Sequence, residues 1–78
     1  EGVPAEIRKE VAHIVTSHEG VLQMHGFYLD SEAKDIRFDV VISFDADPNA
    51  VIEDIRRDVN ALYPDHSLTI TPDVDISD

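Results

Sequence analysis

Residues 36–44, with the sequence IRFDVVISF, decide the fold of this chain. Apolar side chains occupy every second position, so one side of the stretch is apolar and the other is mainly polar. The apolar side consists of Ile36, Phe38, Val40, Ile42 and Phe44. Alternation with a period of two is typical of a β-strand that turns one face toward a core and the other toward solvent. We therefore expect a strand here, with these five side chains turned inward.

A second strand is expected just before it, over residues 21–29, but its alternation fails in the middle. One extra residue at His25-Gly26 would bring its large apolar side chains onto one face, and glycine commonly marks such a β-bulge. These side chains form two pairs of opposite parity, Leu22 with Met24 and Phe27 with Leu29. The polar stretch 30–35 then predicts a hairpin loop, which makes the two strands antiparallel.

Amphipathic helices are expected on both sides of this hairpin. From residue 4 to residue 17 apolar residues recur at helical spacing, and Gly20 suits the left-handed position after a helix end. Asp47-Pro48 predicts the start of a second helix, and Pro64 ends that helix near Tyr63. The inward stripes consist of Ile7, Val11, Ile14 and Val15 in the first helix, and of Val51, Ile52, Ile55, Val59 and Leu62 in the second.

A short third strand over residues 67–71, with Leu68 and Ile70 inward, completes the order helix, strand, strand, helix, strand. The segment 73–78 either extends this strand or frays. A strand–helix–strand crossover is right-handed and joins parallel strands, so the three-stranded sheet should be mixed, with both helices on one face. The predicted fold class is α+β, a single ferredoxin-like αββαβ domain that lacks the first strand of that motif.

The charge of the chain limits its partners. Six Lys and Arg residues stand against 17 Asp and Glu residues, and the formal net charge is −11. Nucleic acids and anionic membranes bind proteins through Lys and Arg, so we expect neither as a partner. The acidic excess is largest in residues 30–47 and 65–78, which flank the open face of the predicted sheet.

Several classes of protein are excluded by what the sequence lacks. It has no cysteine, and therefore no disulfide, thiolate nucleophile or Cys-based metal site. It has no nucleophile beside a base, no glycine-rich phosphate loop and no HExxH helix, so we expect no enzymatic activity and no organic cofactor. No apolar run approaches the roughly 20 residues of a membrane span. We expect a soluble chain that does not insert into a membrane, and its start at Glu1 indicates a processed product or an excised fragment.

The open face carries candidate ligands for a divalent metal ion. His25 lies roughly opposite Asp39 in the predicted hairpin, Asp73 lies at the end of the third strand, and His66 lies in the loop before it. Imidazole and carboxylate groups suit zinc and manganese. Two alternatives to metal binding stay open. His25 could be an exposed histidine beside a carboxylate, and His66 could be a solvated loop histidine. His18 is expected to cap the C-terminus of the first helix.

The chain also resembles the C-terminal cytoplasmic domain of cation diffusion facilitator transporters, over nearly its whole length. The resemblance rests on the order of elements and on three segments, which are HEGVLQMHGF at 18–27, FDVVI at 38–42 and YPD at 63–65 before the last strand. It implies a fragment of a membrane protein that exports divalent cations, commonly zinc or manganese, from the cytoplasm in exchange for protons. It further implies a homodimer of this domain, attached to its own transmembrane domain on the cytoplasmic side of the cell membrane.

The resemblance also implies roles for particular residues. His25 matches the family's histidine in the first strand, and Asp73 matches an acidic metal ligand at the end of the last strand. Metal binding near the dimer interface would then regulate transport. Val41 and Thr71 stand where many members have histidines. The alternative function is a small acidic protein–protein interaction module with no metal role, whose surface docks a basic partner; a copper chaperone of similar topology would need cysteine thiolates.

Overall fold

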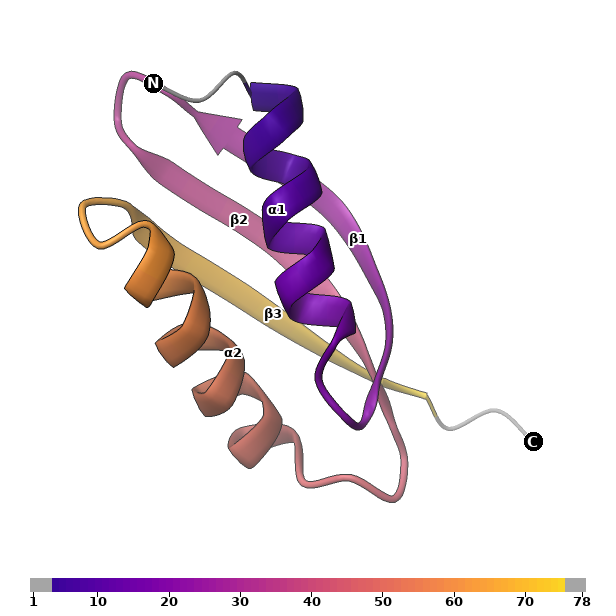
Figure 1. Ribbon diagram of the computed structural model, residues 1–78. Coiled ribbons are helices and arrows are strands. Elements are labelled where there is room, and N and C mark those ends of the chain that lie inside the picture. Colours follow the sequence, from indigo (N-terminus) through magenta and orange to yellow (C-terminus); the bar gives the residue numbers. More distant parts are fainter. Residues whose placement is uncertain (1–3, 76–78) are drawn as a thin grey trace.

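The computed structural model describes residues 4–75 and confirms the predicted order of elements (Figure 1). The elements are α1 (Pro4–Thr16), β1 (Val21–Asp30), β2 (Asp35–Ser43), α2 (Pro48–Leu62) and β3 (Ser67–Asp75). In the sheet β2 is central, antiparallel to β1 and parallel to β3. Both helices cover the same face of the sheet, and no element of residues 4–75 covers the other. The chain thus has the predicted α+β fold of ferredoxin-like type.

The core lies between the helices and the apolar side of β2. The buried side chains recur every fourth residue in the helices and every second residue in β2, because these spacings keep residues on one face of each element. They are Ile7, Val11 and Val15 in α1, Ile36, Phe38, Val40 and Ile42 in β2, and Val51, Ile55 and Val59 in α2. Burial of one such side chain contributes about 1.5–3 kcal/mol. Phe38 also stacks on Phe27 of β1, with ring centroids 6.5 Å apart.

The bulge predicted at His25-Gly26 is confirmed. Between His25 and Tyr28 the register of β1 against β2 shifts by one residue, and Gly26 has a φ of +60°. A glycine in the left-handed region is the first residue of one common bulge type. Because of the extra residue, Phe27 and Leu29 pack against the core while His25 stays on the open face.

A second bulge, between Val21 and Gln23, was not predicted. It makes the prediction that Leu22 packs inward wrong, because the side chain of Leu22 is 53% exposed while Val21 and Met24 pack against the core. Val21 and Leu22 are both apolar, so alternation alone could not decide which of them points inward.

Two further apolar residues also lie outside the core. Phe44 is 74% exposed because β2 ends at Ser43 and the chain turns before the next residue can face the core. Leu62 is exposed as the last residue of α2. The predictions that these two side chains point inward are therefore wrong. β3 is longer than its predicted span, since its register with β2 continues to the pair Ser43 and Asp75.

The ends of the helices follow the predicted signals. The Asp47 carboxylate accepts a hydrogen bond from the Asn49 N–H at 3.1 Å, and Pro48 is the first residue of α2. Gly20, in the loop after α1, has a φ of +93°. No helix within residues 4–75 is both long enough and apolar enough to cross a membrane.

Candidate functional site

The open face of the sheet holds the predicted ligands on β1, β2 and β3. Residues paired across neighbouring strands point to the same side of a sheet, so the register of the strands shows which side chains lie on the open face. The open face consists of Gln23, His25 and Tyr28 from β1, Arg37, Asp39, Val41 and Ser43 from β2, and Thr69, Thr71 and Asp73 from β3. Most of these side chains are polar and exposed.

His25 and Asp39 are direct register partners between β1 and β2, and both are exposed. Cβ atoms of such partners lie about 4.5–5.5 Å apart, so the imidazole and the carboxylate are neighbours. The carboxylate of Asp39 also lies over Gly26, where an added Cβ would come within 3.3 Å of Asp39 Oδ2. The predicted position of His25 opposite Asp39 is confirmed. The glycine in the bulge also leaves room for the carboxylate, which was not predicted.

Asp73 lies near this pair on the neighbouring strand. It pairs with Val41, and Thr71 is the residue directly beside Asp39. The Cα atoms of Asp39 and Asp73 are thus about 8 Å apart, from a step of one strand and two residues. Among the residues that the structure describes, no three His, Asp or Glu side chains gather in a group that could hold a metal ion. One chain therefore presents two neighbouring candidate ligands, His25 and Asp39, and a third, Asp73, on the next strand.

His66 does not join this group. It precedes Ser67, the partner of Asp35, whereas Asp39 pairs with Thr71, five residues after His66 and about 16 Å further along the strand direction. The imidazole packs edge-on against Tyr63, and its Nδ1 is 3.1 Å from Asp65 Oδ1. Hydrogen bonds from Lys34, at 2.9 Å, and from His66 hold the pKa of the Asp65 carboxyl below its usual value. In this structure His66 stabilises the loop between α2 and β3 through its contacts with Tyr63 and Asp65.

Charge is divided unevenly along the open face. Near the hairpin, the Ser67 hydroxyl donates to Asp35 at 2.8 Å and Arg37 Nε lies 2.7 Å from the same carboxylate. These bonds hold the pKa of Asp35 below its usual value, and Asp35 in turn raises the pKa of Arg37. At the other end Asp39 and Asp73 have no ion pair with Lys or Arg in the described part of the chain. The end of the face that carries His25 is therefore negative.

His18 has the structural role that its position predicted. Its Nδ1 is 2.7 Å from the carbonyl oxygen of Ile14 at the end of α1, and its Nε2 is 2.8 Å from Asp58 Oδ2 on α2. The side chain is only 15% exposed. His18 thus caps one helix and ties it to the other.

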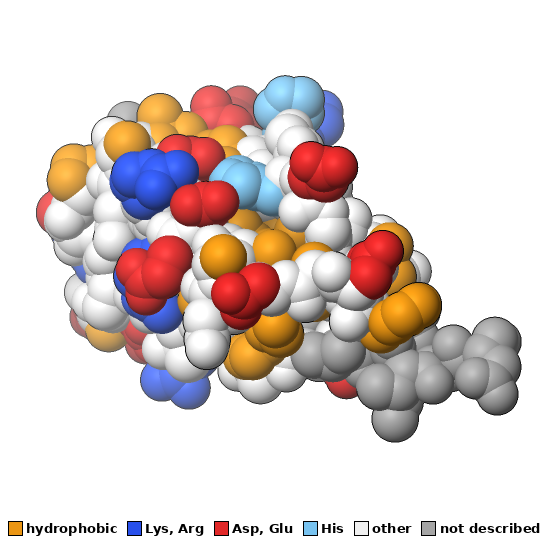
Figure 2. Space-filling view, turned by 90° about the horizontal axis from the view of Figure 1, so that it is seen from below, with side chains coloured by type: hydrophobic (Ala, Val, Ile, Leu, Met, Phe, Trp, Pro, Cys, Tyr) orange, Lys and Arg blue, Asp and Glu red, His pale blue; other side chains and the backbone are white. Residues whose placement is uncertain are grey.

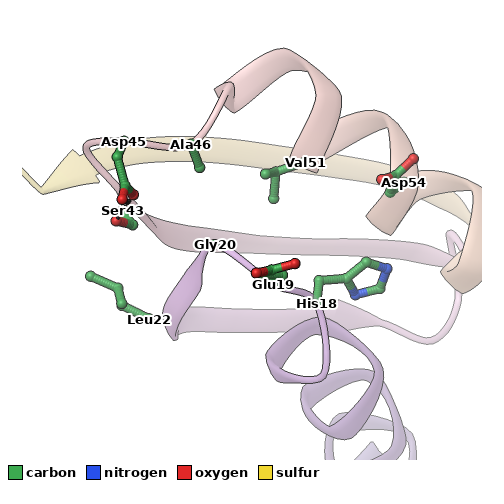
Figure 3. Close-up of a pocket in the computed structure, with 9 residues that line it drawn as sticks. All are labelled: His18, Glu19, Gly20, Leu22, Ser43, Asp45, Ala46, Val51 and Asp54. Atoms are coloured by element: carbon green, nitrogen blue, oxygen red, sulfur yellow. Dashed lines mark hydrogen bonds between the residues drawn. The ribbon is translucent and has the colours of Figure 1, made fainter.

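A pocket that the sequence did not indicate lies where the loop after α1 meets the loop after β2 (Figure 3). It has a volume of about 580 Å³ and is lined by His18, Glu19, Gly20, Leu22, Ser43, Asp45, Ala46, Val51 and Asp54. These residues come from separate segments of the chain, and Leu22 reaches the pocket only because of the unpredicted bulge. No spacing in the sequence could have revealed it.

Comparison with known proteins does not assign the chain to a family. No family model matches it, and no curated protein matches it. The likeness to cation diffusion facilitator domains thus depends on the sequence motifs quoted above and on the order of the helices and strands.

Proposed function

We propose that this chain is the cytoplasmic C-terminal domain of a divalent cation exporter of the cation diffusion facilitator type. In this role it pairs with a second copy and regulates transport by binding metal, and it carries out no catalysis. One observation carries the proposal: the αββαβ fold leaves a sheet face open and sets His25 opposite Asp39 at its negative end. The transport step itself belongs to the transmembrane part of the protein.

The residues on this face fit half of a metal site. Imidazole nitrogen and carboxylate oxygen are accepted ligands of zinc and manganese. Within residues 4–75 one chain does not gather three such groups, and structural zinc sites usually have four ligands. Two chains that meet through their open faces would supply two imidazoles and two carboxylates from His25 and Asp39 alone. Asp73 adds a further carboxylate near the same end.

Electrostatics explains why a metal ion would control such pairing. Each chain carries a formal charge of −11, so two copies repel each other once they approach within the screening length of about 8–10 Å. A divalent cation shared between facing carboxylates lowers this repulsion where it is strongest. The pairing of the two domains would then follow the concentration of metal in the cytoplasm.

Sedimentation velocity, small-angle scattering and thermal unfolding of the chain test the proposal, each with and without zinc or manganese at tens of micromolar. We expect a larger species and a higher melting temperature with metal. Separate His25→Ala, Asp39→Ala and Asp73→Ala substitutions should weaken both effects. A His13→Ala variant, which removes an exposed histidine from α1, should behave as the parent chain.

Two results would contradict the proposal. If metal changes neither association nor stability, the regulatory role is wrong, and the alternative of an acidic interaction module without a metal role is favoured. The transporter assignment is tested separately by the sequence upstream of this chain. Six membrane spans with paired intramembrane Asp and His residues would support it, and their absence from the full-length protein would rule it out.

A further inference from the structure

The pocket in Figure 3 has an apolar floor that extends onto the surface. Gly20, Leu22, Ala46 and Val51 supply the apolar part of its lining, and the side chains of Ala46 and Val51 point into it. The side chain of Leu22, which lines the pocket, is 53% exposed. Exposed apolar surface beside a hollow is a common mark of a binding site.

The walls of this pocket are held close together. The Ser43 N–H donates to the Gly20 carbonyl oxygen at 2.8 Å, which joins the two loops. A Cβ on Gly20 would lie 3.0 Å from Ala46 Cβ and 3.4 Å from Val51 Cγ2, so any other residue here would crowd Ala46 and strain the backbone at a φ of +93°. The pocket is therefore formed before any ligand arrives, which lowers the cost of ordering on binding.

The rim of the pocket is negative. Glu19, Asp45 and Asp54 line it, and no Lys or Arg is among its lining residues. The view onto this end of the molecule shows acidic side chains around a hydrophobic hollow (Figure 2). Asp54 forms an ion pair with Arg57, in which Oδ1 lies 3.2 Å from Nη1. The Asp45 carboxylate accepts a hydrogen bond from the Ser43 hydroxyl at 2.5 Å. Glu19 is exposed and forms no ion pair with the residues that the structure describes.

We propose that this pocket docks an arginine side chain of a partner protein, from a segment in which an apolar residue neighbours the arginine. The methylene stem of arginine packs on apolar surface, here Leu22 and Val51, while its guanidinium stays at a polar rim. A planar guanidinium also forms paired hydrogen bonds with a carboxylate, which Glu19 and Asp45 offer. The apolar neighbour would cover the exposed side chain of Leu22. This surface is distinct from the His25 and Asp39 pair, so the inference does not depend on the proposed function.

Titration of the isotope-labelled chain with a capped Leu-Arg-Leu-Arg-Leu-Arg peptide, followed by amide chemical shifts, tests this inference. We expect saturable shifts in residues 18–22 and 43–46 and at Asp54. The matched control is the same peptide with citrulline, which keeps the shape of arginine without its charge, and it should bind at least about tenfold more weakly. Equal binding of the two peptides, shifts confined to the region around His25, Asp39 and Asp73, or no saturable shift would each overturn the proposal.

Paired variants separate the pocket from the general charge of the chain. A Glu19→Gln, Asp45→Asn variant should weaken binding about three- to tenfold, since exposed charge pairs contribute modestly; asparagine still accepts the Ser43 hydrogen bond. The control, Glu6→Gln with Glu32→Gln, removes the same charge at the far end of the molecule. Leu22→Ser should weaken binding without loss of fold, because this side chain is half exposed. If the control weakens binding as much as the pocket variant, attraction is nonspecific and the proposal is wrong.

Discussion

Substitution of the two left-handed glycines tests the geometry on which both surfaces depend. Gly26 has a φ of +60° in the bulge of β1, and Gly20 has a φ of +93° in the wall of the pocket. An L-residue in the left-handed region costs about 1–2 kcal/mol. For Gly26→Ala this is nearly the whole cost, because the new Cβ meets the end of the exposed Asp39 side chain at 3.3 Å, which can rotate away.

Gly20→Ala should cost more. Its Cβ meets Ala46 Cβ at 3.0 Å, and that atom is fixed to the backbone of the neighbouring loop. Overpacking of this kind adds about 1–3 kcal/mol, which raises the expected total to about 2–5 kcal/mol. A chain of this length has about 4–12 kcal/mol of stability. Gly20→Ala therefore removes a large part of the free energy of unfolding, whereas Gly26→Ala leaves most of it.

Thermal and urea unfolding, followed by far-ultraviolet circular dichroism, measures these differences. A loss of 1 kcal/mol lowers the melting temperature of a domain of this size by about 4–8 °C, so Gly26→Ala should lower it by about 4–16 °C. Gly26→Asn should cost less than alanine although asparagine is larger, because asparagine tolerates the left-handed region. If Gly26→Ala is as stable as the parent chain, or if asparagine destabilises the chain more than alanine does, then Gly26 is not left-handed. The bulge that sets His25 opposite Asp39 would then not exist in solution.

Three further predictions concern the core and the contacts between the helices. Phe38→Ala should lower the free energy of unfolding by about 3–5 kcal/mol in urea, because the ring is fully buried. Substitution of His18 and Asp58 by alanine, singly and together, should give a coupling of about 1 kcal/mol in a double-mutant cycle, since their hydrogen bond at 2.8 Å is partly buried on the His18 side. Burial and the hydrogen bond to Glu10 raise the pKa of Tyr63 to about 12, so its contribution to stability is complete below pH 10 and is lost as the pH rises toward 12. Phenolate absorbance should detect this, and Tyr63→Phe should remove that part of the pH dependence.

The strongest periodic signals predicted the fold correctly. The alternation of residues 36–44 identified the central strand, and Gly26 placed the first bulge, because a period of two that breaks at a glycine is typical of a bulged strand. The capping signals at Asp47 and Gly20 also located the ends of the helices. These features depend on short stretches of chain, which is why the sequence alone suffices for them.

Features that depend on contacts between distant segments were not predictable. Val21 and Leu22 are both apolar, and only pairing with β2 decides that Val21 packs inward. The partner of His18 is Asp58, which lies 40 residues further along the chain. The separation of His66 from His25 likewise follows from the register of β3, not from the local sequence around either histidine.

The free edges of the sheet bear on how this chain can meet a partner. Unpaired strand edges invite the addition of another strand, but the edge of β1 is distorted by two bulges. On β3 the Ser67 N–H bonds to Lys34 on the side of β2, so even-numbered residues turn their backbone to the free edge. There Arg56 bonds the Leu68 carbonyl oxygen at 3.0 Å, and Pro72 has no N–H to donate. With both edges poorly suited to strand addition, the two proposed surfaces would recognise a partner through side chains. Exposed substitutions that spare the fold can therefore distinguish the open face from the pocket.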